Sequence, residues 1–176
     1  MKKLFNIALV GNPNSGKSSL FNLLTGLNQK VGNFPGVTVE KKSGYSRFSE
    51  TLEANVIDLP GTYSLYPKRE DEWISYRVLM QQDELYPDVV IIVADASNLK
   101  RNLLFCSQII DLKIPAVVAL TMADLAKRNG TEIDLPGLER ELGVPVVSIN
   151  PRKNKGVAQL KTALEQTYTS NLKPPA

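Results

Sequence analysis

A glycine-rich segment near the N-terminus limits the folds open to this chain more than any other part of the sequence. The segment Gly11-Asn12-Pro13-Asn14-Ser15-Gly16-Lys17-Ser18 matches the pattern G-x-x-x-x-G-K-[ST] in full, and an apolar run from Leu4 to Val10 leads directly into it. Backbone N–H groups and a helix N-terminus neutralise a phosphate only where no side chain blocks its approach, and Gly11 and Gly16 supply that clearance. We therefore expect a strand, a phosphate-binding loop and then a helix.

The residues of this loop have distinct expected roles. The ammonium group of Lys17 should reach the outer phosphates of a nucleotide as a point charge, and the Ser18 hydroxyl should bind Mg²⁺. Ser19, the next residue, is included in the expected nucleotide site. The alternative is a glycine-rich strand-to-helix turn that binds no ligand. The complete motif, with a strand before it and a helix after it, favours the phosphate site.

The rest of the chain alternates between two kinds of segment. Apolar, β-rich runs lie at Leu4 to Val10, Thr51 to Ile57, Val89 to Ala94, Ala116 to Leu120 and Val144 to Ser148. Helix-length segments lie between most of them, at Lys17 to Thr25, Asp71 to Gln82, Leu99 to Leu112, Leu135 to Leu142 and Val157 to Thr169. This alternation predicts an α/β fold of the P-loop NTPase class, with a mostly parallel sheet of six to seven strands and helices on both faces.

The segment from Val37 to Phe48 departs from that pattern. Its residues partly alternate between apolar and polar, and only Ser49 and Glu50 separate it from the next strand. We expect a hairpin that places one antiparallel strand at an edge of the sheet. Residues 1–170 should form one domain, because 176 residues suffice for a single core, and residues 171–176 should form a tail.

Composition argues against several other functions. The chain has no histidine and Cys106 is its only cysteine, so it lacks the usual general base and any cysteine pair or cluster. The net charge of +3 is small and scattered, which argues against nucleic-acid binding, and we interpret Arg152, Lys153 and Lys155 as a solvated loop. The longest apolar run, Val89 to Ala94, is far shorter than the roughly 20 residues of a membrane-spanning helix.

A second phosphate-related motif follows the run Thr51 to Ile57. In Asp58-Leu59-Pro60-Gly61, a D-x-x-G element, we expect Asp58 to hold Mg²⁺ through water and the Gly61 N–H to sense a γ-phosphate. The alternative is an ordinary turn, since aspartate before Pro-Gly is common in turns. Upstream, the Thr38 hydroxyl should complete the metal shell when a γ-phosphate is present, and Gly36 in the same loop is included in the site.

Recognition of the base is expected after the run Ala116 to Leu120. Thr121-Met122-Ala123-Asp124 occupies the place of the N-K-x-D element of Ras-like GTPases, in which the carboxylate pairs with the N1 and N2 donors of guanine. Asp124 fits that role, and its alternative role is a helix N-cap. The backbone of Ser148-Ile149-Asn150 is expected to contact the base as well.

Three segments together resemble the N-terminal G domain of the ferrous iron transport protein B (FeoB) family: Gly11 to Asn14, Val31 to Glu40 and Asp58 to Leu65. The resemblance runs from about Leu4 to Leu160. It implies a GTP- and GDP-binding domain on the cytoplasmic side of the bacterial inner membrane, followed by a helical domain and a membrane region that carries the iron. We therefore expect this chain to be a portion of a longer protein, with a homo-oligomer left open.

The same resemblance implies how the site works. The family usually has N-M-x-D at the base, so Met122 fits and Thr121 departs, which predicts weaker nucleotide binding with guanine preference retained. Members are similar to potassium-stimulated GTPases, which implies that Asn14 helps to coordinate K⁺; its alternative role is that of a plain turn residue. Thr62 stands where Ras-like enzymes have a water-orienting glutamine, so slow intrinsic GTP hydrolysis is expected.

Two other functions remain open from the sequence. Ribosome-assembly GTPases also carry Pro-Gly-Val-Thr loops, although they usually continue with Arg-Asp where this chain has Val39-Glu40. A nucleotide-dependent switch with negligible turnover is the other. Among the aromatic residues, we expect Phe34 and Tyr63 to lie on mobile loops and to pack back on the domain, with contact to a partner or a membrane domain as the alternative. We expect Trp73 and Tyr76 to lie in the core rather than at an interface.

Overall fold

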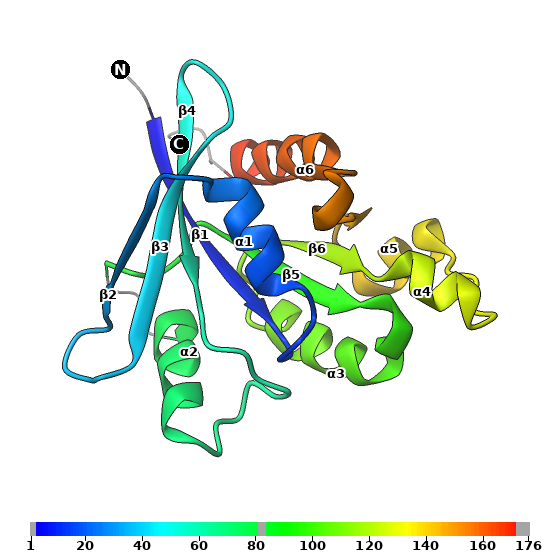
Figure 1. Cartoon of the computed structure of the whole chain (residues 1–176), viewed down its shortest axis with the longest axis horizontal. Coiled ribbons are helices and arrows are strands. Elements are labelled where there is room, and N and C mark those ends of the chain that lie inside the picture. The colour runs from blue at the N-terminus through cyan, green and yellow to red at the C-terminus, as the bar shows by residue number, and fades with distance from the viewer. Residues whose placement is uncertain (1–2, 81–83, 172–176) are drawn as a thin grey trace.

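The computed structural model describes residues 3–80 and 84–171, and its centre is a seven-stranded sheet in the order β2-β3-β4-β1-β5-β6-β7 (Figure 1). The strands are β1 (Lys3–Gly11), β2 (Gln29–Asn33), β3 (Glu40–Arg47), β4 (Leu52–Asp58), β5 (Val89–Asp95), β6 (Ala116–Thr121) and β7 (Val146–Ser148). Neighbouring strands in the part β4-β1-β5-β6-β7 of the sheet are parallel, whereas β3 runs antiparallel to both of its neighbours. The mostly parallel sheet is confirmed.

Helices cover both faces of this sheet, as the alternating segments predict. They are α1 (Lys17–Thr25), α2 (Glu70–Met80), α3 (Leu99–Ile110), α4 (Ala123–Arg128), α5 (Leu135–Leu142) and α6 (Val157–Ser170), with 3₁₀ turns η1 (Ala96–Asn98) and η2 (Pro151–Lys153). Figure 1 shows α1 and α6 on one side of the sheet and α2 and α3 on the other. Because successive residues of a strand point to opposite faces, Val89 packs with the α1 and α6 side and Val90 with the α2 and α3 side.

The expectation of a single antiparallel strand at the sheet edge is wrong in one respect. The antiparallel strand, β3, is second from the edge, and the edge itself is β2. All five residues of β2 are exposed, so this strand has no alternation between apolar and polar residues that the sequence could reveal. Helix α4 was also not expected, because six residues are too few to give a helical period.

Two aromatic residues, Phe34 and Trp73, differ in their burial. Trp73 is 50% exposed, so the expectation that it lies in the core is wrong. Its ring packs edge-on against that of Tyr76, with 5.6 Å between the ring centroids. The buried positions of α2 are instead on the side of Ile74 and Val78, which turns residue 73 outward. Phe34 is only 3% exposed and belongs to the core, as expected for a loop aromatic that packs back on the domain. Gln82, the expected end of α2, lies outside the described residues.

Cys106 lies on α3 inside the core, and burial raises the pKa of its thiol to about 12. The thiol is therefore protonated at neutral pH and is a poor nucleophile. Within residues 3–80 and 84–171, no helix has both the length and the apolar character required to cross a membrane.

Candidate nucleotide-binding site

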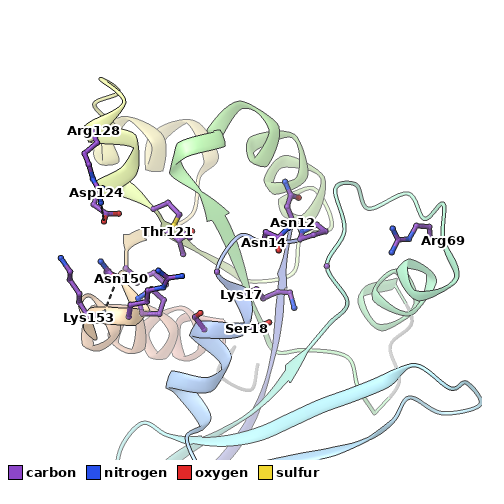
Figure 2. A pocket seen from close by; sticks show the side chains of 18 residues that line it. Asn12, Asn14, Lys17, Ser18, Arg69, Thr121, Asp124, Arg128, Asn150 and Lys153 are labelled. Carbon is purple, nitrogen blue, oxygen red and sulfur yellow. Dashed lines mark hydrogen bonds and ion pairs between the residues drawn. The ribbon is translucent and has the colours of Figure 1, made fainter.

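The main cavity of the domain, about 820 Å³ in volume, opens at the carboxyl ends of β1 and β6. In open α/β sheets ligands bind at this edge, and the volume is in the range of small-molecule sites. The predicted site residues that line the cavity are Asn12, Pro13, Asn14, Gly16, Lys17, Ser18, Ser19, Gly61, Thr121, Met122, Asp124, Ile149 and Asn150. In Figure 2, Asp124 and Asn150 lie at one end, and the loop residues Asn14 and Lys17 lie nearer the other.

The phosphate-binding loop joins β1 to α1 with a backbone that few side chains tolerate. Asn14 has φ of 63° and Gly16 has φ of 94°, both in the left-handed region. At Gly11 a Cβ atom would lie 2.8 Å from the Val93 carbonyl oxygen and 2.9 Å from Ser15 Oγ, so only glycine fits. Gly11 and Ser15 are both buried beneath the exposed residues of the loop. Gly16 is the N-cap of α1, whose first turn carries no acidic residue that would repel an anion.

Lys17 and Asp58, the residues predicted to contact phosphate and Mg²⁺, form an ion pair with each other. Their side chains are only 10% and 11% exposed. Asp58 comes from the end of β4 and does not itself line the cavity, but it is paired with Lys17, which does. One carboxylate and the exposed Ser18 hydroxyl are a donor set that suits Mg²⁺, which keeps waters and takes further oxygens from phosphates.

The loop after β4 packs directly against the phosphate-binding loop. The Thr62 backbone N–H donates to the Gly11 carbonyl oxygen at 3.1 Å, and a Cβ atom at Gly61 would lie 3.2 Å from Pro13 Cα. Thr62 is 5% exposed, and its hydroxyl donates to the Ser64 carbonyl oxygen at 2.7 Å. The threonine hydroxyl is therefore engaged within its own loop rather than directed at a substrate water.

The loop after β4 is also hydrogen-bonded to α3. The side-chain oxygen of Gln108 accepts hydrogen bonds from the Leu65 backbone N–H at 2.8 Å and from the Ser64 hydroxyl at 3.3 Å. Arg101, also on α3, lies 3.9 Å from the ring centroid of Tyr63, which is 43% exposed. Tyr63 therefore packs back on the domain, as the sequence interpretation has it.

Gly36 and Thr38 are not among the residues that line the cavity. Both lie in the turn between β2 and β3, where Thr38 is exposed. Phe34, buried at the start of the turn, anchors it through a hydrogen bond from its N–H to the Val39 carbonyl oxygen at 3.0 Å. Their roles at the metal and the γ-phosphate remain predictions.

At the base end, Thr121 is 1% exposed, and its hydroxyl donates to the Ser15 carbonyl oxygen at 2.6 Å and lies 3.2 Å from that of Ala94. Its polar group thus holds the phosphate-binding loop to β6. Asp124 lies in the first turn of α4, 54% exposed, and pairs with Arg128 at 3.4 Å. The alternative that Asp124 is the N-cap is wrong, because Met122 occupies that position without a side-chain cap bond.

Replacing Thr121 with valine is expected to destabilise the domain by about 1–3 kcal/mol, because the substitution keeps the shape but removes the hydroxyl that donates to the buried Ser15 carbonyl oxygen. Urea unfolding followed by circular dichroism measures the effect. Thr121→Ser, which keeps the hydroxyl, is the matched control and should lie closer to the parent. A valine variant as stable as the parent would contradict a stabilising role for the hydrogen bond from Thr121 to Ser15.

The residues of the predicted loop Ser148-Ile149-Asn150 line two different cavities. Ile149 and Asn150 line the main cavity, and the side-chain oxygen of Asn150 accepts from the Lys153 N–H at 3.3 Å. Ser148 instead lines a separate, smaller cavity. A Cβ atom at Gly156 would lie 2.2 Å from the Ser148 carbonyl oxygen, so this glycine is what lets the loop close before α6.

Sequence reasoning missed several residues that line the main cavity, most of them cationic: Arg69, Arg128, Pro151, Arg152 and Lys153. Arg152 and Lys153 are exposed, as a solvated loop would be, yet they also border the base end of the cavity. Their position directly after Ser148-Ile149-Asn150 was the available signal. Nothing in the sequence alone ties Arg69 to the phosphate-binding loop.

The chain was compared with known proteins. The family described as ferrous iron transport protein B matches residues 5–164. The chain is 50% identical over 165 residues to the Fe(2+) transporter FeoB of Leptospira biflexa, covering 93% of this chain and 24% of that protein. It is 44% identical over 176 residues to that of Escherichia coli strain K12, covering 97% of this chain and 22% of that protein. The chain thus spans about a quarter of the length of these curated relatives.

Solved structures give the same answer. The G domain of T. maritima FeoB superimposes with a TM-score of 0.85 at 40% identity, covering 94% of this chain and 99% of that one. The cytosolic domain of the same protein matches in its GDP form II, with a TM-score of 0.90, 39% identity and coverage of 98% and 66%. Its GMPPNP form gives a TM-score of 0.88, 40% identity and coverage of 98% and 67%. On these grounds the chain belongs to the ferrous iron transport protein B family and has the fold of its G domain.

Proposed function

We propose that this domain binds GTP and GDP with Mg²⁺, hydrolyses GTP to GDP and phosphate, and thereby regulates a ferrous iron transporter of which it is the cytosolic part. One observation carries the proposal: a single cavity brings the phosphate-binding loop, Gly61 and Asp124 together, and its lining residue Lys17 pairs with Asp58. The relatives whose structures are described as GDP and GMPPNP forms support it.

Each group has a role that its position allows. The N–H groups between Asn14 and Ser18 and the N-terminus of α1 surround the phosphates, and the Lys17 ammonium leaves Asp58 to pair with the outer phosphates. Ser18 and Thr38 would hold Mg²⁺ through their hydroxyl groups and Asp58 would hold it through water, and the ion would neutralise charge on the phosphate oxygens. The Gly61 N–H responds to the third phosphate.

At the base end, the Asp124 carboxylate accepts the two hydrogen bonds that guanine offers through N1 and N2. Adenine has no such pair of donors, so Asp124 sets the preference. Met122 lines the cavity beside it, and Ile149 and Asn150 complete the wall. The hydroxyl of Thr121 donates to the Ser15 carbonyl oxygen of the loop, so we expect Thr121 to affect affinity through the loop rather than through the base.

Hydrolysis should be slow and faster in K⁺ than in Na⁺, because Thr62 offers no carboxamide for the water and Asn14 lines the cavity at its phosphate end. Single-turnover phosphate release in the two salts measures this. Asn14→Gly is the sharpest variant, since glycine accepts the φ of 63° while the amide ligand is removed. It should lose the potassium stimulation and keep GDP affinity within about tenfold. Equal parent rates in K⁺ and Na⁺ would remove the potassium role.

Of the other two functions, membership of the FeoB family argues against ribosome assembly. A switch with negligible turnover keeps one observation in its favour, the engagement of the Thr62 hydroxyl within its own loop. The phosphate-release assay separates them: bound GTP that stays intact over hours, in K⁺ and Mg²⁺, identifies the switch. The helical and membrane domains of the parent transporter are the expected partners.

A further inference from the structure

Arg69 is a cation at the end of the cavity opposite to Asp124. It belongs to the loop that precedes α2, and it lines the same cavity as Gly61 and Lys17. Figure 2 shows its guanidinium extending from that loop toward the phosphate-binding loop. A nucleotide whose base pairs with Asp124 and whose phosphates follow the loop presents its last phosphate toward this end.

The other cations that line the cavity are already committed elsewhere. Arg128, Arg152 and Lys153 border the base end, and Lys17 pairs with Asp58. Lys17 contacts the phosphates before reaction as well as during it. Transfer of a phosphoryl group is accelerated by a cation that meets the charge developing as the bond breaks, and a guanidinium fork suits phosphate oxygens geometrically.

Little holds Arg69 in its present position. Its side chain is 76% exposed, and its Nε atom lies 3.7 Å from Asp71 Oδ1 and 4.0 Å from Glu72 Oε1. The pair with Asp71, whose side chain is 37% exposed, contributes little, and the pair with the less exposed Glu72 spans 4.0 Å, so exchanging them for a phosphate is feasible. Both ion pairs use Nε, and within the described part of the chain no ion pair engages the two terminal nitrogen atoms of the fork.

We propose that Arg69 is a catalytic residue, an arginine supplied by this chain itself that contacts the γ-phosphate in the transition state; this rests on the proposed GTPase function. In the step, a water oxygen bonds to the γ-phosphorus while the bond to the β–γ bridging oxygen breaks. The electron pair of that bond goes to the β-phosphate, and the water's protons go to the released phosphate and solvent. Arg69 neutralises charge on the bridging and γ oxygens as this happens.

The test uses Arg69→Ala and Arg69→Lys, with Lys68→Ala as the matched control, because Lys68 is exposed, adjacent and not part of the cavity lining. Single-turnover GTP hydrolysis in K⁺ and in Na⁺ gives the rates. Binding of mant-GDP, with and without aluminium fluoride, separates ground-state affinity from affinity for the transition-state mimic. The aluminium fluoride complex is the readout that a merely structural role would not change.

Arg69→Ala is expected to slow hydrolysis by at least about tenfold in both salts and to lose the aluminium fluoride complex, with GDP affinity unchanged within about twofold. Arg69→Lys should fall between this variant and the parent, and Lys68→Ala should match the parent. An Arg69→Ala rate equal to the parent overturns the proposal, as does an equal loss of GDP affinity and rate. If the parent itself binds no guanine nucleotide, the proposed function fails instead, which is a separate result.

Discussion

The Asp124→Asn variant is expected to change the preferred base of this domain from guanine to xanthine. A carboxylate accepts from both N1–H and N2–H of guanine, whereas a carboxamide accepts one hydrogen bond and donates the other. Xanthine keeps N1–H but carries an oxygen at C2, so it complements asparagine. Because Asp124 is more than half exposed and lines the cavity, the substitution should not disturb the core.

The expected loss of GDP affinity in Asp124→Asn is on the order of 10³-fold, near 4 kcal/mol, because a site built for two hydrogen bonds is left with an opposed donor pair. Calorimetric titration with GDP and with xanthosine diphosphate measures both sides of the exchange. Arg128→Ala, which removes the ion pair at 3.4 Å but leaves the carboxylate, is the control and should keep guanine preference. Unchanged GDP affinity in Asp124→Asn would remove Asp124 from base recognition.

Replacing Lys17 with alanine is expected to abolish nucleotide binding at micromolar concentrations, with affinity for GTP and GDP lowered on the order of 10²–10³-fold. The ammonium is the one side-chain cation at the phosphate-binding loop itself, and its loss also leaves the nearly buried Asp58 carboxylate without its partner. Destabilisation of about 1–3 kcal/mol should accompany the binding defect, since an unpaired buried charge is costly.

The two effects of Lys17 can be separated with a double variant. Lys17→Met combined with Asp58→Asn removes both charges, so much of the lost stability should return while binding stays lost. Urea unfolding and fluorescence titration with mant-GDP are the measurements. A Lys17→Ala protein that binds GTP like the parent would show that the ammonium does not contact the phosphates.

What the sequence could predict was local in character. The phosphate-binding loop is specified by Gly11, Gly16 and Lys17 within eight residues, and the start of α1 at Lys17 follows from that motif. Asp124 was found because it follows a strand at a fixed offset. Helix α5 has the expected bounds, and Asp134 caps it, accepting from the Gly137 N–H at 3.1 Å.

The remaining features depend on contacts between distant segments. Strand β2 is polar and exposed and exists only because it pairs with β3. The outward position of Trp73 depends on which side of α2 meets the sheet. The bond from Thr121 to Ser15 joins residues 106 positions apart, and no pattern in the Thr121-Met122-Ala123-Asp124 segment could reveal that this hydroxyl serves the loop rather than the base.

Gln108 on α3 accepts two hydrogen bonds from the loop after β4, so a movement of that loop affects α3. Any displacement of Leu65 that accompanies a change at Gly61 must either break its bond to Gln108 or pull the helix along. On the outer surface of α3, Leu104 is 59% exposed. A rearrangement at Gly61 is thereby linked, through Gln108, to the exposed surface of α3.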